Sequence, residues 1–317
     1  MKKLFILFSA GMLLLSACVC DCHLFQEYTP QTVMGETYGT EGAGEFAFEG
    51  VTELMNRVYK TVGGLNLRFD IFFPTVKKFE RAPLAVGFHG GGWTAGDKSD
   101  ITRGFAPLIA ELRANGYAVA TVQYRLANPP GVVFPAPFDD AAAFIGYIKE
   151  NAGVYNIDRE NIGVFGFSAG AHLAMLIAYA TDFDITYCIS FAGPAKLHGG
   201  DPASYPRETM FLVENLFGGA YGELPELYRA GSPFYYLESA EHRQTPLMLV
   251  HDRTDIVVPF SQSEIMFEKA RSLGIESELL ELRGVGHDID FNNANMRERE
   301  EVMSAVLNFI YKFHKNY

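Results

Sequence analysis

The stretch around Ser168 constrains the fold of this 317-residue chain more than any other. Residues 162–167 form an apolar run typical of a buried strand, and residues 169–180 are rich in the helix formers Ala, Leu and Met. Ser168 lies between them in the pattern G-x-S-x-G. A strand that turns sharply into a helix needs Gly166 and Gly170, because a side chain at either position would collide with the crossing backbone.

Such a turn exposes the serine hydroxyl at the N-terminus of the helix, where developing negative charge is stabilised. A glycine-rich strand–helix turn with an incidental serine fits the same pattern. The rest of the chain must therefore supply a base, an acid and an oxyanion site.

Short apolar runs alternate with helical segments along the remaining chain, which predicts an α/β fold. Further strands are expected at residues 84–88, 117–122, 186–191, 246–251 and 276–282, and helices at 105–113, 138–150, 261–272 and 296–314. Strands that alternate with helices predict right-handed crossovers and a mostly parallel, twisted sheet with helices on both faces. Residues 53–73 instead alternate in polarity around Gly63-Gly64, which predicts an antiparallel hairpin at one edge of the sheet.

Residues 194–245 interrupt this rhythm. They contain several Gly and Pro turns but also many Phe, Tyr and Leu residues, too many for a disordered linker. We interpret the segment as a small helical cap inserted between two strands. Such a cap covers an active site, or it merely packs on the sheet.

The N-terminus predicts export. Two lysines precede an apolar segment, residues 4–15, that is too short to span a membrane, so residues 1–17 are expected to be a signal peptide. Leu15-Ser16-Ala17-Cys18 resembles the bacterial lipobox, in which the cysteine is lipidated. Residues 18–50 are then a tether and residues 51–317 a single α/β domain. The protein is expected to be an exported bacterial lipoprotein, anchored to a membrane and facing the periplasm or the cell surface.

Charge and cysteine content narrow the possible partners. The formal net charge of −12 disfavours nucleic acid, whose phosphates an acidic protein repels. Cys20, Cys22 and His23 lack the second ligand segment that structural zinc sites use, so no metal site is predicted. Cys188 lies in an expected core strand and is predicted to be a buried apolar residue. No cofactor is predicted.

A base and an acid for Ser168 are found on later loops. His287 follows a predicted strand in the sequence Gly-Val-Gly-His. The other histidines are weaker candidates, because they lie on the glycine loop (His89), on the helix after the serine (His172) or at the end of a buried strand (His251), or lack a strand-end context (His23, His198, His242 and His314). Asp252 and Asp255 both follow the strand ending near His251. We favour Asp255 as the acid because a loop carboxylate reaches a neighbouring loop more freely, and we expect Asp252 to stabilise the turn.

The glycine loop His89-Gly90-Gly91-Gly92-Trp93 supplies candidate oxyanion donors. The amides of Gly91 and Gly92, with that of Ala169, would converge on an oxyanion. A phosphate loop is the alternative for a triple glycine, but neither G-x-x-x-x-G-K-[ST] nor a dinucleotide fingerprint is present.

From about residue 52 onward, these motifs resemble α/β-hydrolases of the esterase and lipase group, and within them bacterial feruloyl and acetyl esterase-like enzymes of the BD-FAE type. The resemblance rests on the glycine loop through Lys98, the segment 166–174, Tyr228-Arg229-Ala230-Gly231-Ser232-Pro233, residues 255–259 and Gly286-His287. The family usually has a glycine where this chain has Asp252.

The resemblance implies a serine carboxylic ester hydrolase with an acyl-enzyme intermediate, acting on acetyl or aromatic acyl esters of carbohydrates. Arylformamidases and lipases share the same motifs and are the alternative. A non-catalytic lipoprotein that binds ligands under its cap, and a serine amidase or peptidase, are the remaining hypotheses.

Overall fold

The computed structural model describes residues 50–198, 205–238, 244–293 and 296–315. The predicted signal peptide, Cys18 and nearly all of the predicted tether lie outside the described residues, as do two short parts of the predicted cap. Among the described residues, no helix has both the length and the apolar character needed to cross a membrane.

The core of the molecule is one eight-stranded sheet in the order β1-β2-β4-β3-β5-β6-β7-β8. Strands β3 to β8 run parallel to one another, whereas β2 pairs antiparallel with both β1 and β4. This confirms the predicted, mostly parallel sheet and its edge hairpin. The strands are β1 (Glu53–Val62), β2 (Leu65–Phe72), β3 (Ala82–Phe88), β4 (Ala118–Val122), β5 (Ile157–Phe167), β6 (Cys188–Phe191), β7 (Leu247–Asp252) and β8 (Ser277–Leu282).

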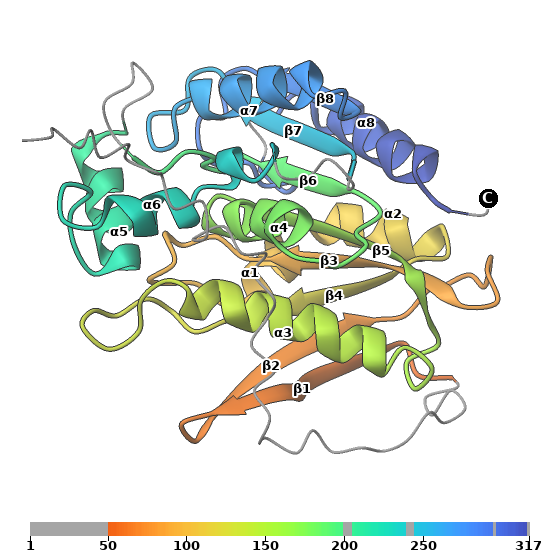
Figure 1. Cartoon of the computed structure of the whole chain (residues 1–317). Coiled ribbons are helices and arrows are strands. Elements are labelled where there is room, and N and C mark those ends of the chain that lie inside the picture. The colour runs from red at the N-terminus through yellow and green to blue at the C-terminus, as the bar shows by residue number, and fades with distance from the viewer. Residues whose placement is uncertain (1–49, 199–204, 239–243, 294–295, 316–317) are drawn as a thin grey trace, which may run out of the picture.

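Helices cover both faces of this sheet (Figure 1). Buried side chains of α3 (Ala136–Glu150), α4 (Ala169–Ala180) and α7 (Ser261–Ser272) belong to one hydrophobic core. Those of α1 (Lys98–Gly104), α2 (Ala106–Ala114) and α8 (Arg299–Lys312) belong to a second core. The central strands are buried on both faces, as expected for runs without alternation.

The predicted cap is helical in its described parts. Helices α5 (Arg207–Phe217) and α6 (Pro225–Ala230) and the single turn η2 (Pro233–Tyr235) lie between β6 and β7 in the chain. They gather at one end of the sheet in Figure 1. The insertion therefore forms the connection between the parallel strands β6 and β7.

Helix α1 was not predicted. Its sequence KSDITRG has one large apolar residue, Ile101, so it lacks the apolar periodicity that identifies a helix. It is held instead by a capping box, in which Asp97 accepts from the Ser99 amide and Asp100 accepts from the Asp97 amide. Lys98 adds a buried ion pair of 2.8 Å to Asp70 on β2, which fixes the end of the glycine loop to the sheet.

Candidate active site

Ser168 lies on the sharp turn between β5 and α4. Its φ of 54° and ψ of −121° are strained for a residue with a side chain. The turn is held on both sides, because the Ser168 amide donates to the Phe191 carbonyl on β6 and the Ser168 carbonyl accepts from the His172 amide. The side chain is nearly buried, with 8% of the residue exposed.

The glycines that flank this turn leave no room for a side chain. A Cβ at Gly166 would lie 2.3 Å from the carbonyl carbon of Gly170, and a Cβ at Gly170 would lie 2.0 Å from the Phe88 carbonyl oxygen on β3. The close approach of α4 to β3 and β5 therefore depends on both glycines.

We expect Gly170→Ala to destabilise the fold by about 3 kcal/mol or more, because backbone atoms rather than a flexible side chain would have to move. Gly146→Ala in α3 is the matched control, since its nearest neighbour would be 3.8 Å from the new Cβ. That control should be neutral or stabilising by up to about 1 kcal/mol. Urea unfolding of the two variants checks the contrast, and equal stabilities would contradict it.

Ser168, His287 and Asp255 form one hydrogen-bonded chain. His287 Nε2 lies 2.9 Å from Ser168 Oγ, and His287 Nδ1 lies 2.6 Å from Asp255 Oδ2. With Nδ1–H donating to the carboxylate, the lone pair of Nε2 faces the serine hydroxyl. The ring of Phe167, the residue before the serine, packs against the imidazole at 5.1 Å between centroids.

The structure distinguishes the two candidate acids. Asp255 contacts His287, whereas Asp252 accepts from the amide and hydroxyl of Thr254 and from the Val285 amide. Burial opposes ionisation of Asp255, but hydrogen bonds from His251 and His287 outweigh it and hold the pKa of Asp255 well below its usual range. Asp255 is therefore ionised at neutral pH.

Sequence reasoning missed a second histidine beside the acid. His251 is fully buried at the end of β7, and its Nε2 lies 3.1 Å from Asp255 Oδ2 and 3.0 Å from the Val258 carbonyl. Because a carbonyl can only accept, Nε2 carries the proton and donates to both oxygens. The other carboxylate oxygen of Asp255 accepts from the amides of Val257 and Val258, so the orientation of the carboxylate is fixed on both sides.

The glycine loop after β3 brings the predicted oxyanion donors beside the serine. A Cβ at Gly90 would lie 3.3 Å from Ser168 Cβ, so the loop passes directly over the turn. Gly91 has φ of 107°, and its carbonyl accepts from the amides of Thr94 and Ala95, which curls the loop. Within the described residues, no protein acceptor is found for the amides of Gly91, Gly92 and Ala169.

Helix α5 of the cap contacts two of the loops that carry these groups. The Thr209 hydroxyl donates to the Val257 carbonyl at 2.7 Å in the acid loop. Leu212 packs on the glycine loop, since its Cδ1 lies 2.6 Å from where a Cβ of Gly92 would be. Helix α5 therefore contacts both the acid loop and the glycine loop.

His172 joins α4, the glycine loop and the cap. It is completely buried, its Nδ1 accepts from the indole N–H of Trp93 at 3.2 Å, and its Nε2 donates to the Gly231 carbonyl. Both ring nitrogens are used by the neutral form. Burial lowers the pKa of His172 to about 4, although the hydrogen bond to Gly231 acts in the opposite direction.

This lowered pKa predicts acid sensitivity. In the unfolded chain the histidine binds a proton as the pH falls through about 6.5, whereas folded His172 stays neutral until about pH 4. Stability is therefore lost as the pH falls across this window, by about 3 kcal/mol in total. His172→Gln should be less stable at pH 7 but should lose correspondingly less between pH 7 and 4, as urea unfolding at several pH values would show. An unchanged pH dependence in the variant would contradict the assignment.

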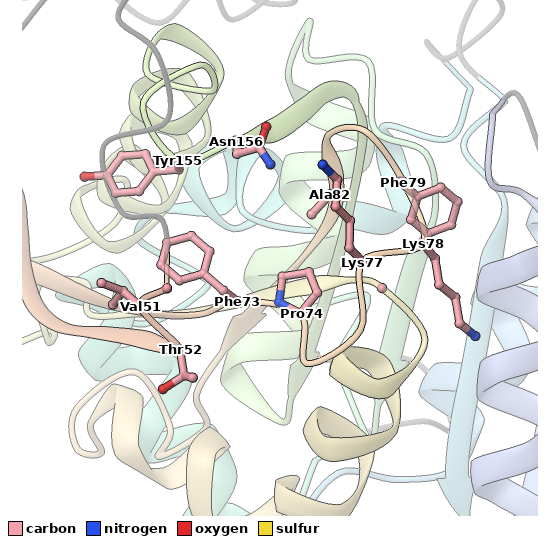
Figure 2. A pocket seen from close by; sticks show the side chains of 12 residues that line it. Val51, Thr52, Phe73, Pro74, Lys77, Lys78, Phe79, Ala82, Tyr155 and Asn156 are labelled. Carbon is pink, nitrogen blue, oxygen red and sulfur yellow. The ribbon is translucent and has the colours of Figure 1, made fainter.

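Two cavities differ in their relation to this site. One of about 220 Å³ is lined by Gly90 of the glycine loop and by Phe167 and Asp288, the chain neighbours of Ser168 and His287. The other, about 250 Å³, lies among Phe73, Phe79 and Tyr155 (Figure 2). It borders the amino ends of β3 and β5, whereas Ser168 follows the carboxyl end of β5, so it is not part of the candidate site.

Among the described residues, no group of three or more His, Cys, Asp or Glu side chains is arranged to hold a metal ion. Cys20, Cys22 and His23 lie outside those residues. Cys188 is a buried free cysteine on β6, and burial raises the pKa of its thiol far above the usual value, so it lacks the thiolate that a ligand or nucleophile needs.

The sheet, its flanking helices and the serine turn define the class of the protein as an α/β-hydrolase fold. Esterase 2 of Thermogutta terrifontis, solved after phosphonylation by sarin, superposes with a TM-score of 0.69 at 21% identity, over 83% of this chain and 96% of that chain. Its propionate-bound structure gives a TM-score of 0.67 at the same identity.

The family can be stated more narrowly. The chain belongs to the BD-FAE family, whose model matches residues 69–270. Esterase LipQ of Mycobacterium tuberculosis is 28% identical over 78% of this chain, and esterase LipC of the same organism is 24% identical over 73%. The chain spans 61% of the length of LipQ and 59% of LipC.

Proposed function

We propose that the protein is a serine carboxylic ester hydrolase. The observation that carries this proposal is the chain of hydrogen bonds from Asp255 through His287 to Ser168, with distances of 2.6 and 2.9 Å. A hydroxyl in contact with a neutral imidazole, which is itself held by an ionised carboxylate, is an activated nucleophile. The similarity to LipQ and LipC, both described as esterases, agrees with ester hydrolysis.

The reaction follows from this geometry in two stages. His287 Nε2 takes the proton of Ser168 as Oγ attacks the ester carbonyl carbon, and the imidazolium is stabilised by Asp255. His287 then protonates the leaving alcohol, which departs and leaves an acyl group on Ser168. Water, deprotonated by His287, attacks this acyl group and releases the carboxylic acid.

The oxyanion formed in each stage needs fixed donors. The amides of Gly91, Gly92 and Ala169 are the proposed donors, because they surround the serine turn and bond no protein acceptor among the described residues. Removal of one such donor typically costs about 2.7–4 kcal/mol of transition-state stabilisation.

We further propose acetyl or aromatic acyl esters of carbohydrates as the substrates. Membership of the BD-FAE family supports this choice, as does the cavity beside Phe167 and Asp288, whose lining combines apolar and charged side chains. Hydrolysis of acetylated xylan, feruloylated oligosaccharides, short p-nitrophenyl esters and formylkynurenine, measured side by side, tests it. Preference for formylkynurenine or for the simple esters would favour an arylformamidase or a short-chain lipase instead, and no hydrolysis of any of them would contradict the esterase proposal.

The membrane anchor is a separate proposal that rests on the lipobox-like sequence ending at Cys18. Lipidation of this cysteine would hold an exported enzyme at a membrane surface, facing the periplasm or the exterior. The full-length protein expressed in a bacterium should partition into the detergent phase of a Triton X-114 extract, and Cys18→Ser should move it to the aqueous phase. Equal partitioning of the two would contradict anchoring through Cys18.

A further inference from the structure

Asp252 connects the loops that carry the acid and the base. It ends β7 and is completely buried, as is its carboxylate. One carboxylate oxygen accepts from the amide and the hydroxyl of Thr254, both at 2.7 Å, in the turn that leads to Asp255. The other oxygen accepts from the Val285 amide at 2.7 Å, two residues before His287.

We propose that Asp252 is a positioning residue that holds His287 in line with Ser168. It does so through the backbone of the loop after β8, not by contact with the imidazole. This inference rests on the serine-esterase function proposed above, and it adds a residue that acts through the base.

The loop that carries His287 has few other constraints before the histidine. Gly284 and Gly286 have φ of 90° and 61°, and nothing lies within 4 Å of where their Cβ atoms would be. Val285 between them packs into the second core, and its amide is the group that Asp252 binds. Without this bond, the segment would be held by the apolar packing of Val285 and by the 3.2 Å bond from the Asp288 amide to the Val285 carbonyl.

The same carboxylate also shapes the acid loop. The bonds from Thr254 to this carboxylate lie within a turn that the Asp255 amide closes by donating to the Asp252 carbonyl at 3.2 Å. Asp255 is thereby held at the end of this turn. Burial opposes ionisation of Asp252, but the hydrogen bonds from Thr254 and from the amides of Val285 and Gly286 outweigh it and lower its pKa. A charged acceptor gives stronger bonds to these amides than a neutral one would.

A neutral side chain cannot replace the carboxylate at this position. The amide of Asn has one oxygen and one NH₂ group, so in Asp252→Asn an NH₂ group must face either the Thr254 amide or the Val285 amide. Asp252→Gly introduces the residue that the family usually has at this position, and it removes both acceptor oxygens. Thr254→Val is the matched control, because it deletes one hydroxyl bond and keeps the bond to Val285.

The test measures kcat and KM per active site, counted by titration with a fluorophosphonate, for the wild type and the three variants. We expect Asp252→Asn and Asp252→Gly to lower kcat about 10- to 100-fold with KM within about twofold, as displacement of a catalytic group does. Thr254→Val should stay within about threefold of the wild type. Lower melting temperatures with an unchanged kcat per site would overturn the proposal and leave Asp252 with a structural role only.

Hydrogen exchange of the wild-type protein gives a second, independent readout if a variant does not fold. The Val285 amide should exchange at least about 100-fold more slowly than an unprotected amide, and exchange at the unprotected rate would overturn the proposal. A wild-type protein that neither hydrolyses esters nor reacts at Ser168 would instead contradict the proposed function itself.

Discussion

Ser168→Ala is expected to lower kcat for p-nitrophenyl acetate by about 10⁶-fold. The substitution removes only the hydroxyl group, whose oxygen lies 2.9 Å from His287 Nε2. The variant retains the donors proposed for the oxyanion, so a small residual rate above the uncatalysed reaction is expected. Alanine should tolerate the turn as serine does, because its backbone requirements at φ of 54° are similar.

Ser272→Ala is the matched control. Ser272 ends α7, and the bond that its hydroxyl makes among the described residues is to a carbonyl of the same helix, that of Lys269. This control should keep the wild-type rate, and both variants should melt within a few degrees of the wild type. A Ser168→Ala enzyme with more than about 1% of the wild-type kcat would contradict the role of Ser168 as nucleophile.

Asp255→Asn is expected to lower kcat by about 10⁴-fold with little change in KM. The amide oxygen can keep the bonds from the amides of Val257 and Val258, which leaves its NH₂ group toward the two histidines. His287 Nδ1 must then accept rather than donate, so its proton moves to Nε2. In that tautomer the imidazole cannot take the proton of Ser168.

The control for this change is Asp158→Asn at the start of β5. Asp158 also accepts from the amide two residues ahead, at 3.0 Å for Glu160 compared with 2.8 Å for Val257 at Asp255. It differs in having no contact with the candidate site, so kcat should not change. Comparable activity of the two Asn variants would show that the carboxylate of Asp255 does not set the tautomer of His287.

Most of the fold could be predicted from the sequence, because buried parallel strands are continuous apolar runs and their crossover helices are rich in helix formers. The boundaries of α7 and the edge hairpin β1–β2 agree with the pattern. Helix α1 could not be predicted in this way, because its stability comes from the Asp97 capping box and the Lys98–Asp70 pair rather than from an apolar face.

The residues proposed for catalysis could be found because each follows a strand in the order serine, acid, histidine. Their supporting contacts could not. His251 donates a hydrogen bond to Asp255, and Asp252 accepts one from the Val285 amide, 33 positions along the chain. His172 joins the glycine loop to the cap. These contacts depend on which loops meet in space, and no spacing in the sequence encodes that.

The central claim is that Ser168 is an activated nucleophile, and covalent labelling tests it most directly. The protein is incubated with a fluorophosphonate, digested, and analysed by mass spectrometry. We predict a single phosphonyl adduct on the peptide containing Ser168, formed rapidly by the wild type and not by Ser168→Ala. An unlabelled wild-type protein, or an adduct that persists when Ser168 is replaced, would contradict the account.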